Sequence, residues 1–253
     1  MIPQLRGWTA VQRTPANNVR LGVTLSFVAG ATNAGGFLAV GQYTSHMTGV
    51  LSSVADSLVL GQATLALAGL AALLAFTLGA MTTAWMVNWG LRRQLQSAYG
   101  RPLLLEAALL LVFGLVGTGI NFFAPLFAPL TVLVLCFIMG LQNAVITKIS
   151  HAEIRTTHIT GLLTDLGIEL GKLFYINRFT REHLVEGNRQ KIRLHLSLIT
   201  SFFIGGVMGA LGFKYIGFIS TVPLAVLLFL LVWRPVLNDA RHWIDPQRPD
   251  ADD

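Results

Sequence analysis

Long apolar stretches dominate this chain and alternate with short polar or charged segments. A helix of about 20 apolar residues crosses the ~30 Å hydrocarbon core of a bilayer. Six apolar stretches come close to that length: 21–40, 64–89, 102–124, 129–147, 195–213 and 217–233. The pattern therefore predicts an all-α polytopic membrane protein with about six transmembrane helices.

A polar, glycine-rich motif interrupts the apolar pattern twice. Its first part is G-x-x-N-A and its second part is H-x-T-G. The two copies are Gly30 to Ala34 with His46 to Gly49, and Gly140 to Ala144 with His158 to Gly161. A weaker match follows each copy, in Phe76-x-x-Gly79 and Phe203-x-x-Gly206. A duplicated polar break in an apolar chain is typical of transporters built from two repeats.

The basic residues between the stretches predict the orientation of the chain. They gather in segments 1–20, 90–101, 177–194 and 234–248. Lysine and arginine are enriched in cytoplasmic loops, so all four segments are expected in the cytoplasm. This assignment gives six crossings with both termini inside, in a bacterial cytoplasmic (inner) membrane.

Three crossings separate the two motif copies, so the halves would be inverted relative to each other. Each half contains a short helix, predicted at 49–61 and 161–175, that is too short for a comfortable span. We expect both segments to re-enter the protein from opposite faces. The alternative is that both short helices cross, which would give eight spans.

This topology divides the chain into four parts. They are a cytoplasmic N-terminal tail (1–17), a first membrane repeat (18–124), a second membrane repeat (125–235) with a cytoplasmic basic loop (177–194), and a cytoplasmic C-terminal tail (236–253). The uncharged segment 122–129 contains two prolines and is expected to form an external turn.

The duplicated polar residues are the candidate solute-binding residues. Threonine before glycine can cap the start of a broken helix, and such a start favours negatively charged ligands. Histidine can donate, accept or change its charge near neutral pH. Amides buried in a membrane need partners. The candidates are Asn33, His46, Thr48, Gly49, Gln142, Asn143, His158, Thr160 and Gly161. The structural alternative is that they only cap helices, bond loop carbonyls or join helices.

Acidic residues in the short helices are the candidates for proton or ion coupling. Asp56 falls in the first short helix, and Asp165 and Glu169 fall on one face of the second. Carboxylates inside a membrane mark ion or proton paths. Glu169 has an ion pair with Lys172 as its structural alternative. Glu106, near Arg101, is expected to reach the inner interface.

Other functional classes find little support in the sequence. The net charge of +6 lies in the loops, as topology requires, so nucleic acid is not an expected partner. The chain lacks hydrolase, metalloprotease and nucleotide-binding motifs. The single cysteine, Cys136, has no metal-ligand spacing around it. No catalytic residues, cofactor or metal are therefore expected. The partners would be a small solute or ion and membrane lipids, and a homo-oligomer is compatible with the pattern.

The motifs also support a resemblance to a known family. Met47-Thr48-Gly49 follows a glycine-rich helix, and the second copy continues through Thr156 to Gly161 into Asp165-Leu166-Gly167. In these features the chain resembles the YoaK-like bacterial membrane proteins, from about residue 20 to 235. Val50 departs from that pattern, because many members have asparagine there. The resemblance implies a multispan inner-membrane protein and no particular substrate.

Three functional hypotheses are compatible with the sequence, and the inverted duplication favours the first. The first is a secondary transporter or channel for a small solute or ion, with its site between the two H-x-T-G segments and with proton coupling by the acids. The alternative is a membrane enzyme that acts on a lipophilic substrate through His46 or His158, or a scaffold or sensor that transports nothing.

Overall fold

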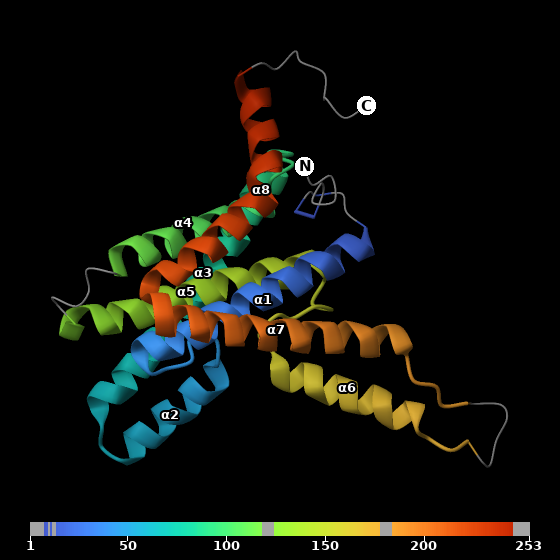
Figure 1. The fold of residues 1–253 in the computed structure, drawn as a ribbon, viewed down its shortest axis with the longest axis horizontal. Coiled ribbons are helices and arrows are strands. Elements are labelled where there is room, and N and C mark those ends of the chain that lie inside the picture. Colours follow the sequence, from blue (N-terminus) through green and yellow to red (C-terminus); the bar gives the residue numbers. More distant parts are fainter. Residues whose placement is uncertain (1–7, 10, 12–13, 118–123, 178–183, 245–253) are drawn as a thin grey trace.

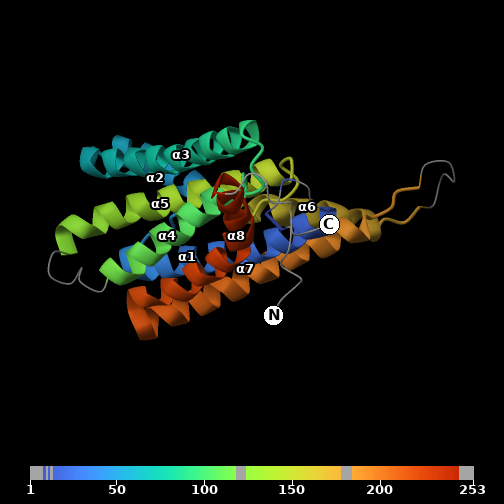
Figure 2. The same ribbon diagram turned by 90° about the horizontal axis from the view of Figure 1, so that it is seen from above.

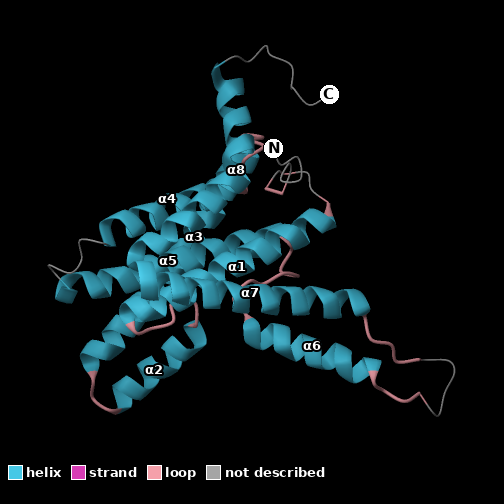
Figure 3. Ribbon diagram, viewed as in Figure 1, coloured by secondary structure: helices cyan, strands magenta, loops and turns pink. Residues whose placement is uncertain are grey.

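The computed structural model describes residues 8–9, 11, 14–117, 124–177 and 184–244, and the regular structure within them is helical (Figure 3). The elements are α1 (Pro15–Val40), α2 (Met47–Val59), α3 (Ala63–Arg92), α4 (Gly100–Gly117), α5 (Ala124–Ile149), α6 (Ile159–Leu173), α7 (Arg189–Ile216), the 3-10 helix η3 (Gly217–Ser220) and α8 (Thr221–Ile244).

Each of the six apolar stretches contains a helix, and two helices begin inside segments that the sequence predicts as a turn or a loop: α5 at Ala124, and α7 at Arg189 within the basic loop 177–194. Helix α5 already begins at Ala124, inside the segment 122–129 that the sequence assigned to an external turn. Pro125 stands in its first turn, where proline is tolerated because the N–H group has no helical partner. Residues 122 and 123 lie outside the described part of the chain.

Length and composition make several of these helices able to cross a membrane. Among the described residues, four stretches qualify: Pro15–Val40, Ala63–Arg92, Pro129–Ile149 and Arg189–Asp239. The last stretch is 51 residues long and contains both α7 and most of α8. These properties indicate a membrane-embedded helical protein.

The long helices pack in two matched pairs. Helix α1 packs along α7, and α3 packs along α5. These four helices follow the long axis of the molecule, and α1 and α5 run in opposite directions (Figures 1 and 2). Helices α4 and α8 pack together on one side, whereas α2 and α6 lie on the other, against α3 and α7 (Figure 1).

Glycines bring the paired helices into backbone contact. A Cβ atom added to Gly30 in α1 would lie 2.0 Å from the carbonyl oxygen of Phe202 in α7. One added to Gly140 in α5 would lie 2.0 Å from the carbonyl oxygen of Phe76 in α3. No side chain fits at either distance, so the first glycine of each G-x-x-N-A motif is required for packing.

The reverse contacts correct the register of the weaker sequence match. A Cβ atom on Gly79 would lie 2.1 Å from the carbonyl oxygen of Phe137, and one on Gly205 would lie 2.1 Å from that of Phe27. At Gly206 the nearest atom is 3.7 Å away, an ordinary contact. The partner of Phe76-x-x-Gly79 is therefore Phe202-x-x-Gly205, and the predicted register one residue later is wrong.

Candidate functional site

The two short helices have the same construction. Helix α2 has 13 residues and α6 has 15. At 1.5 Å per residue they are about 20 and 22 Å long, well short of a ~30 Å membrane span. Both begin near the middle of the molecule and run toward opposite ends of its long axis (Figures 1 and 2). The predicted short helices are thus confirmed, but each begins two residues earlier than expected.

The histidine of each H-x-T-G motif lies across the first turn of its own helix. A Cβ atom on Gly49 would be 2.2 Å from Cδ2 of His46, and one on Gly161 would be 2.2 Å from Cδ2 of His158. Any larger residue would displace the imidazole ring. The spacing of histidine and glycine in the motif therefore has a physical reason: the glycine makes room for the ring.

The predicted threonine caps are wrong. His46 and His158 occupy the N-cap positions, and Thr48 and Thr160 stand inside the first turn, where both side chains are exposed. A threonine at this second helical position lies beyond the N-cap, so its hydroxyl cannot cap the first N–H groups of the helix.

The starts of α2 and α6 have no side-chain cap among the described residues. The first helical hydrogen bonds run from Val50 to the His46 carbonyl and from Leu162 to the His158 carbonyl, both at 3.1 Å. The N–H groups before them in each first turn carry partial positive charge, and neither turn contains an acidic residue. Both imidazole rings beside these groups are exposed.

The motif asparagines hold the loops that lead into the short helices. Asn33 Oδ1 accepts a hydrogen bond from the Ser45 backbone N–H at 3.1 Å. Asn143 Oδ1 accepts one from the Thr157 hydroxyl at 2.7 Å. Each asparagine therefore binds the residue directly before the motif histidine, rather than joining two helices as the structural alternative proposed.

Gln142 is separated from these exposed turns. It is fully buried, and neither its side-chain oxygen nor its nitrogen has a hydrogen-bond partner among the described residues. Thr32, which stands at the matching position of the first motif, is 1% exposed and its hydroxyl is equally unpartnered. The residue before each motif asparagine is therefore polar and buried in the core.

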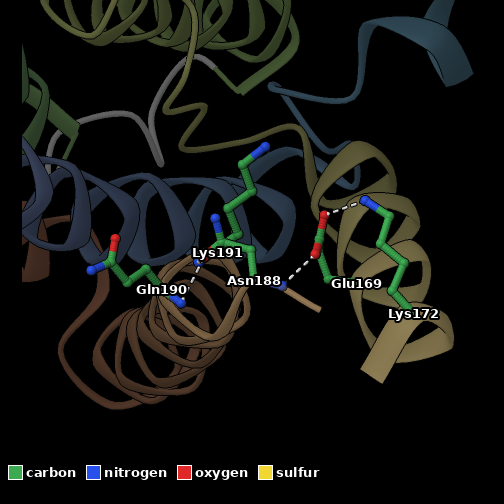
Figure 4. Close-up of polar contacts among 5 residues, drawn as sticks. All are labelled: Glu169, Lys172, Asn188, Gln190 and Lys191. Carbon is green, nitrogen blue, oxygen red and sulfur yellow. Dashed lines mark hydrogen bonds and ion pairs between the residues drawn. The ribbon is translucent and has the colours of Figure 1, made fainter. Parts of the chain in front are cut away.

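The three candidate coupling acids have different surroundings. Asp56 in α2 and Asp165 in α6 are exposed. Glu169 is buried, accepts a hydrogen bond from Lys172 Nζ at 2.8 Å, and accepts another from the Asn188 backbone N–H at 2.7 Å (Figure 4). The ion pair offered as the structural alternative for Glu169 is thus confirmed.

The Glu169 contacts join the end of α6 to the start of α7. Asn188 caps α7 by accepting hydrogen bonds from the N–H groups of Gln190 and Lys191 (Figure 4). The Lys172 hydrogen bond, together with the one from Asn188, lowers the pKa of Glu169 below its ordinary value. This carboxylate therefore fixes α6 against α7.

The burial of Glu106 was not predicted from the sequence. This residue was expected to reach the inner interface, but its side chain is completely buried in α4, and both carboxyl oxygens lack partners among the described residues. Its spacing from Arg101 suggested an interfacial position. Only packing shows that it points into the core.

Metal binding finds no support in the described part of the chain, where no group of three or more histidine, cysteine, aspartate or glutamate side chains could hold an ion. Cys136 is buried and unpaired.

The motifs predicted a particular membrane-protein family, and the comparisons with known proteins support family membership but not the predicted family name. Neither the curated proteins nor the solved structures include a significant match to the chain. Residues 21–233 match the family described as Protein of unknown function (DUF1275). This match includes both G-x-x-N-A and both H-x-T-G motifs, whereas the YoaK-like name and the bacterial origin stay predictions. The chain therefore belongs to the DUF1275 family of proteins of unknown function.

Proposed function

We propose that the chain is a secondary transporter or channel for a small solute or ion, built from two inverted repeats. The repeats are α1–α4 and α5–α8, and each has three transmembrane helices and one short re-entrant helix. The matched pairing supports this division: α1 packs on α7 as α5 packs on α3, through equivalent glycines. The opposite directions of α1 and α5 support the inversion (Figure 1).

The observation that carries the proposal is the matched pair of uncapped helix starts. Discontinuous helices of transporters direct their N-terminal ends at negatively charged groups of the substrate. Here α2 and α6 each present uncapped N–H groups, an exposed threonine and an exposed histidine. The solute would bind between them through a negatively charged or electron-rich group, with His46, Thr48, His158 and Thr160 as its contacts.

The remaining candidates have supporting roles in this proposal. Asn33 and Asn143 would position the two turns, because their side-chain oxygens accept hydrogen bonds from Ser45 and Thr157. Asp56 and Asp165, exposed on α2 and α6, would couple protons or bind cations. Glu169 would hold α6 in place through its ion pair.

Flux measurements in proteoliposomes test the proposal. Chloride, nitrate, acetate and lactate gradients would be imposed in turn, and flux would be recorded for the wild type, the double variant His46→Ala/His158→Ala, Asp56→Asn and Asp165→Asn. The control is His151→Ala, an exposed histidine in the loop before α6. We expect at least one anion to pass, with flux reduced about tenfold in the double variant and unchanged in the control. Flux no higher than in empty liposomes would contradict transport, and flux equal in all variants would contradict the site.

A cysteine-accessibility scan tests the topology. Replacing Cys136 by alanine removes the one cysteine of the chain. New cysteines at the exposed positions Gln42 and Glu186 would then report on the two loops. The six-span arrangement predicts labelling of position 42 from outside, and of position 186 only after the membrane is permeabilised. Labelling of position 186 from outside would contradict it.

A further inference from the structure

Glu106 is a buried carboxyl group that has no role in the proposed solute site. Among the side chains that the structure describes, no other carboxyl group is completely buried. It lies on the face of α4 that carries Leu103, Ala107 and Leu110, all within the main hydrophobic core. Neither carboxyl oxygen has a hydrogen-bond partner in the part of the chain that the structure describes.

Gln142 is also completely buried, on a helix that packs against α4. Its neighbours along α5, Met139 and Ile146, belong to the core that contains Ala107, and α4 packs against α5. Glu106 comes six residues after the start of α4, and Gln142 comes seven residues before the end of α5. These two helix ends lie at the same end of the bundle (Figure 1). At 1.5 Å per residue, Glu106 lies about 9 Å along α4 from this end and Gln142 lies about 10 Å along α5 from it.

The charge state of Glu106 follows from these surroundings. An ionised carboxylate without a partner is strongly disfavoured in an apolar core, whereas an uncharged carboxylic acid is tolerated much better. A side-chain amide has both a donor and an acceptor, so Gln142 can complement either the acid or the carboxylate. Among the described residues neither Gln142 nor Glu106 has a hydrogen-bond partner, so the two side chains are not bonded to each other here and Gln142 would bind the carboxyl group after a side-chain rotation.

We infer that Glu106 is a proton-binding site of this protein, and that Gln142 is its positioning residue. The carboxyl group holds a proton while the core around α4 is closed. When the core opens, the proton leaves to water and the carboxylate becomes hydrated. No other reactant is needed, because the proton comes from one aqueous phase and returns to another.

No neighbouring charge replaces the proton. The elements packed on α4 are α3, α5, η3 and α8. Within their described side chains the charged or titratable groups are Arg92, Cys136, Lys148, Arg234 and Asp239. Lys148 donates to Asn88, and Asp239 accepts from the N–H groups of Gln96 and Ser97. In the described structure, none of the five is bonded to Glu106.

As a coupling site, Glu106 rests on the proposed transport, but its proton can be detected without any transport. Infrared spectra of the full chain in lipid nanodiscs would be compared with those of Glu106→Gln. The matched control is Glu169→Gln, which removes an ion-paired carboxylate. We expect a protonated carboxylic-acid carbonyl band at neutral pH that is absent from Glu106→Gln and retained in the control. Identical bands in the wild type and Glu106→Gln would overturn the inference.

A second variant covers the case in which Glu106→Gln does not fold. Gln142→Leu keeps Glu106 and removes the amide, so the carbonyl band should persist at a shifted frequency. A wild type without any such band overturns the proton site, and an unshifted band overturns the role of Gln142. In proteoliposomes, the flux of Glu106→Gln should lose the dependence on a pH gradient that the wild type shows. Absence of all wild-type flux would refute the proposed function and leave the infrared result to decide the proton site.

Discussion

Asn33 in α1 holds Ser45, because its side-chain oxygen accepts a hydrogen bond from the Ser45 backbone N–H at 3.1 Å. Asn143 holds Thr157 in a similar way, but its side-chain oxygen accepts from the Thr157 hydroxyl, at 2.7 Å. Both held residues directly precede a motif histidine, so each long helix determines where a short helix begins. This relationship explains why G-x-x-N-A and H-x-T-G occur together twice in the chain.

Removing one asparagine side chain should loosen one short helix. We expect Asn33→Ala to lower the free energy of unfolding by about 1–2 kcal/mol, because the Ser45 N–H loses its partner. Asn33→Asp keeps the acceptor and should be milder. Thermal unfolding in mild detergent measures the effect, with Gln42→Ala, an exposed amide in the same loop, as the control. A loss no larger than that of the control would show that Asn33 does not fix the turn.

Two adjacent glycines in α7 provide a direct test of the helix pairing. Gly205→Ala places a methyl group 2.1 Å from the Phe27 carbonyl oxygen, whereas Gly206→Ala meets its nearest atom only at 3.7 Å. Because backbone must move in the first case, we expect Gly205→Ala to destabilise by at least about 2 kcal/mol and Gly206→Ala to be nearly neutral. Equal unfolding temperatures for the two variants would refute the register in which α1 packs on α7.

The ion pair of Glu169 predicts a pH-dependent contribution to stability. Its pKa is lowered in the folded chain, chiefly by the Lys172 hydrogen bond, so the stabilisation is fully present above the unfolded value of about 4.3. It is lost as pH falls through the lower folded value. The unfolding temperature of Glu169→Gln should therefore lie below that of the wild type at neutral pH, and the difference should shrink in acid. A difference that is constant with pH would contradict the ion-pair role.

The sequence predicted the helices well because a helix that crosses a membrane needs a long apolar stretch and basic flanking loops. Both features can be read from the sequence without knowing how the helices pack. The short helices were equally visible, since Met47 to Val59 and Ile159 to Leu173 stand between longer apolar stretches. The motif offsets also identified Gly30 and Gly140 as equivalent, and both glycines contact a partner helix in the same way.

Side-chain roles were harder to predict because several residues satisfy the same pattern. Phe202 and Phe203, followed by Gly205 and Gly206, allow two registers, and only the distance to Phe27 separates them. Threonine is a common helix cap, so Thr48 seemed suited to that role until the His46 ring was found over Gly49. The burial of Glu106 depends on which face of α4 meets the core, and proximity to Arg101 in sequence gives no information on this.

We propose that the matched starts of α2 and α6 form the transport site, and a pair of glycine variants in α6 can separate this site from one elsewhere in the molecule. Gly161→Ala forces the His158 ring out of place, because the nearest ring atom is 2.2 Å from the new methyl group, whereas Gly167→Ala meets no atom within 4 Å. The measurement is anion flux in proteoliposomes containing equal amounts of folded protein. We expect Gly161→Ala to lower flux about tenfold and Gly167→Ala to leave it unchanged. Equal flux through both variants and the wild type would contradict it.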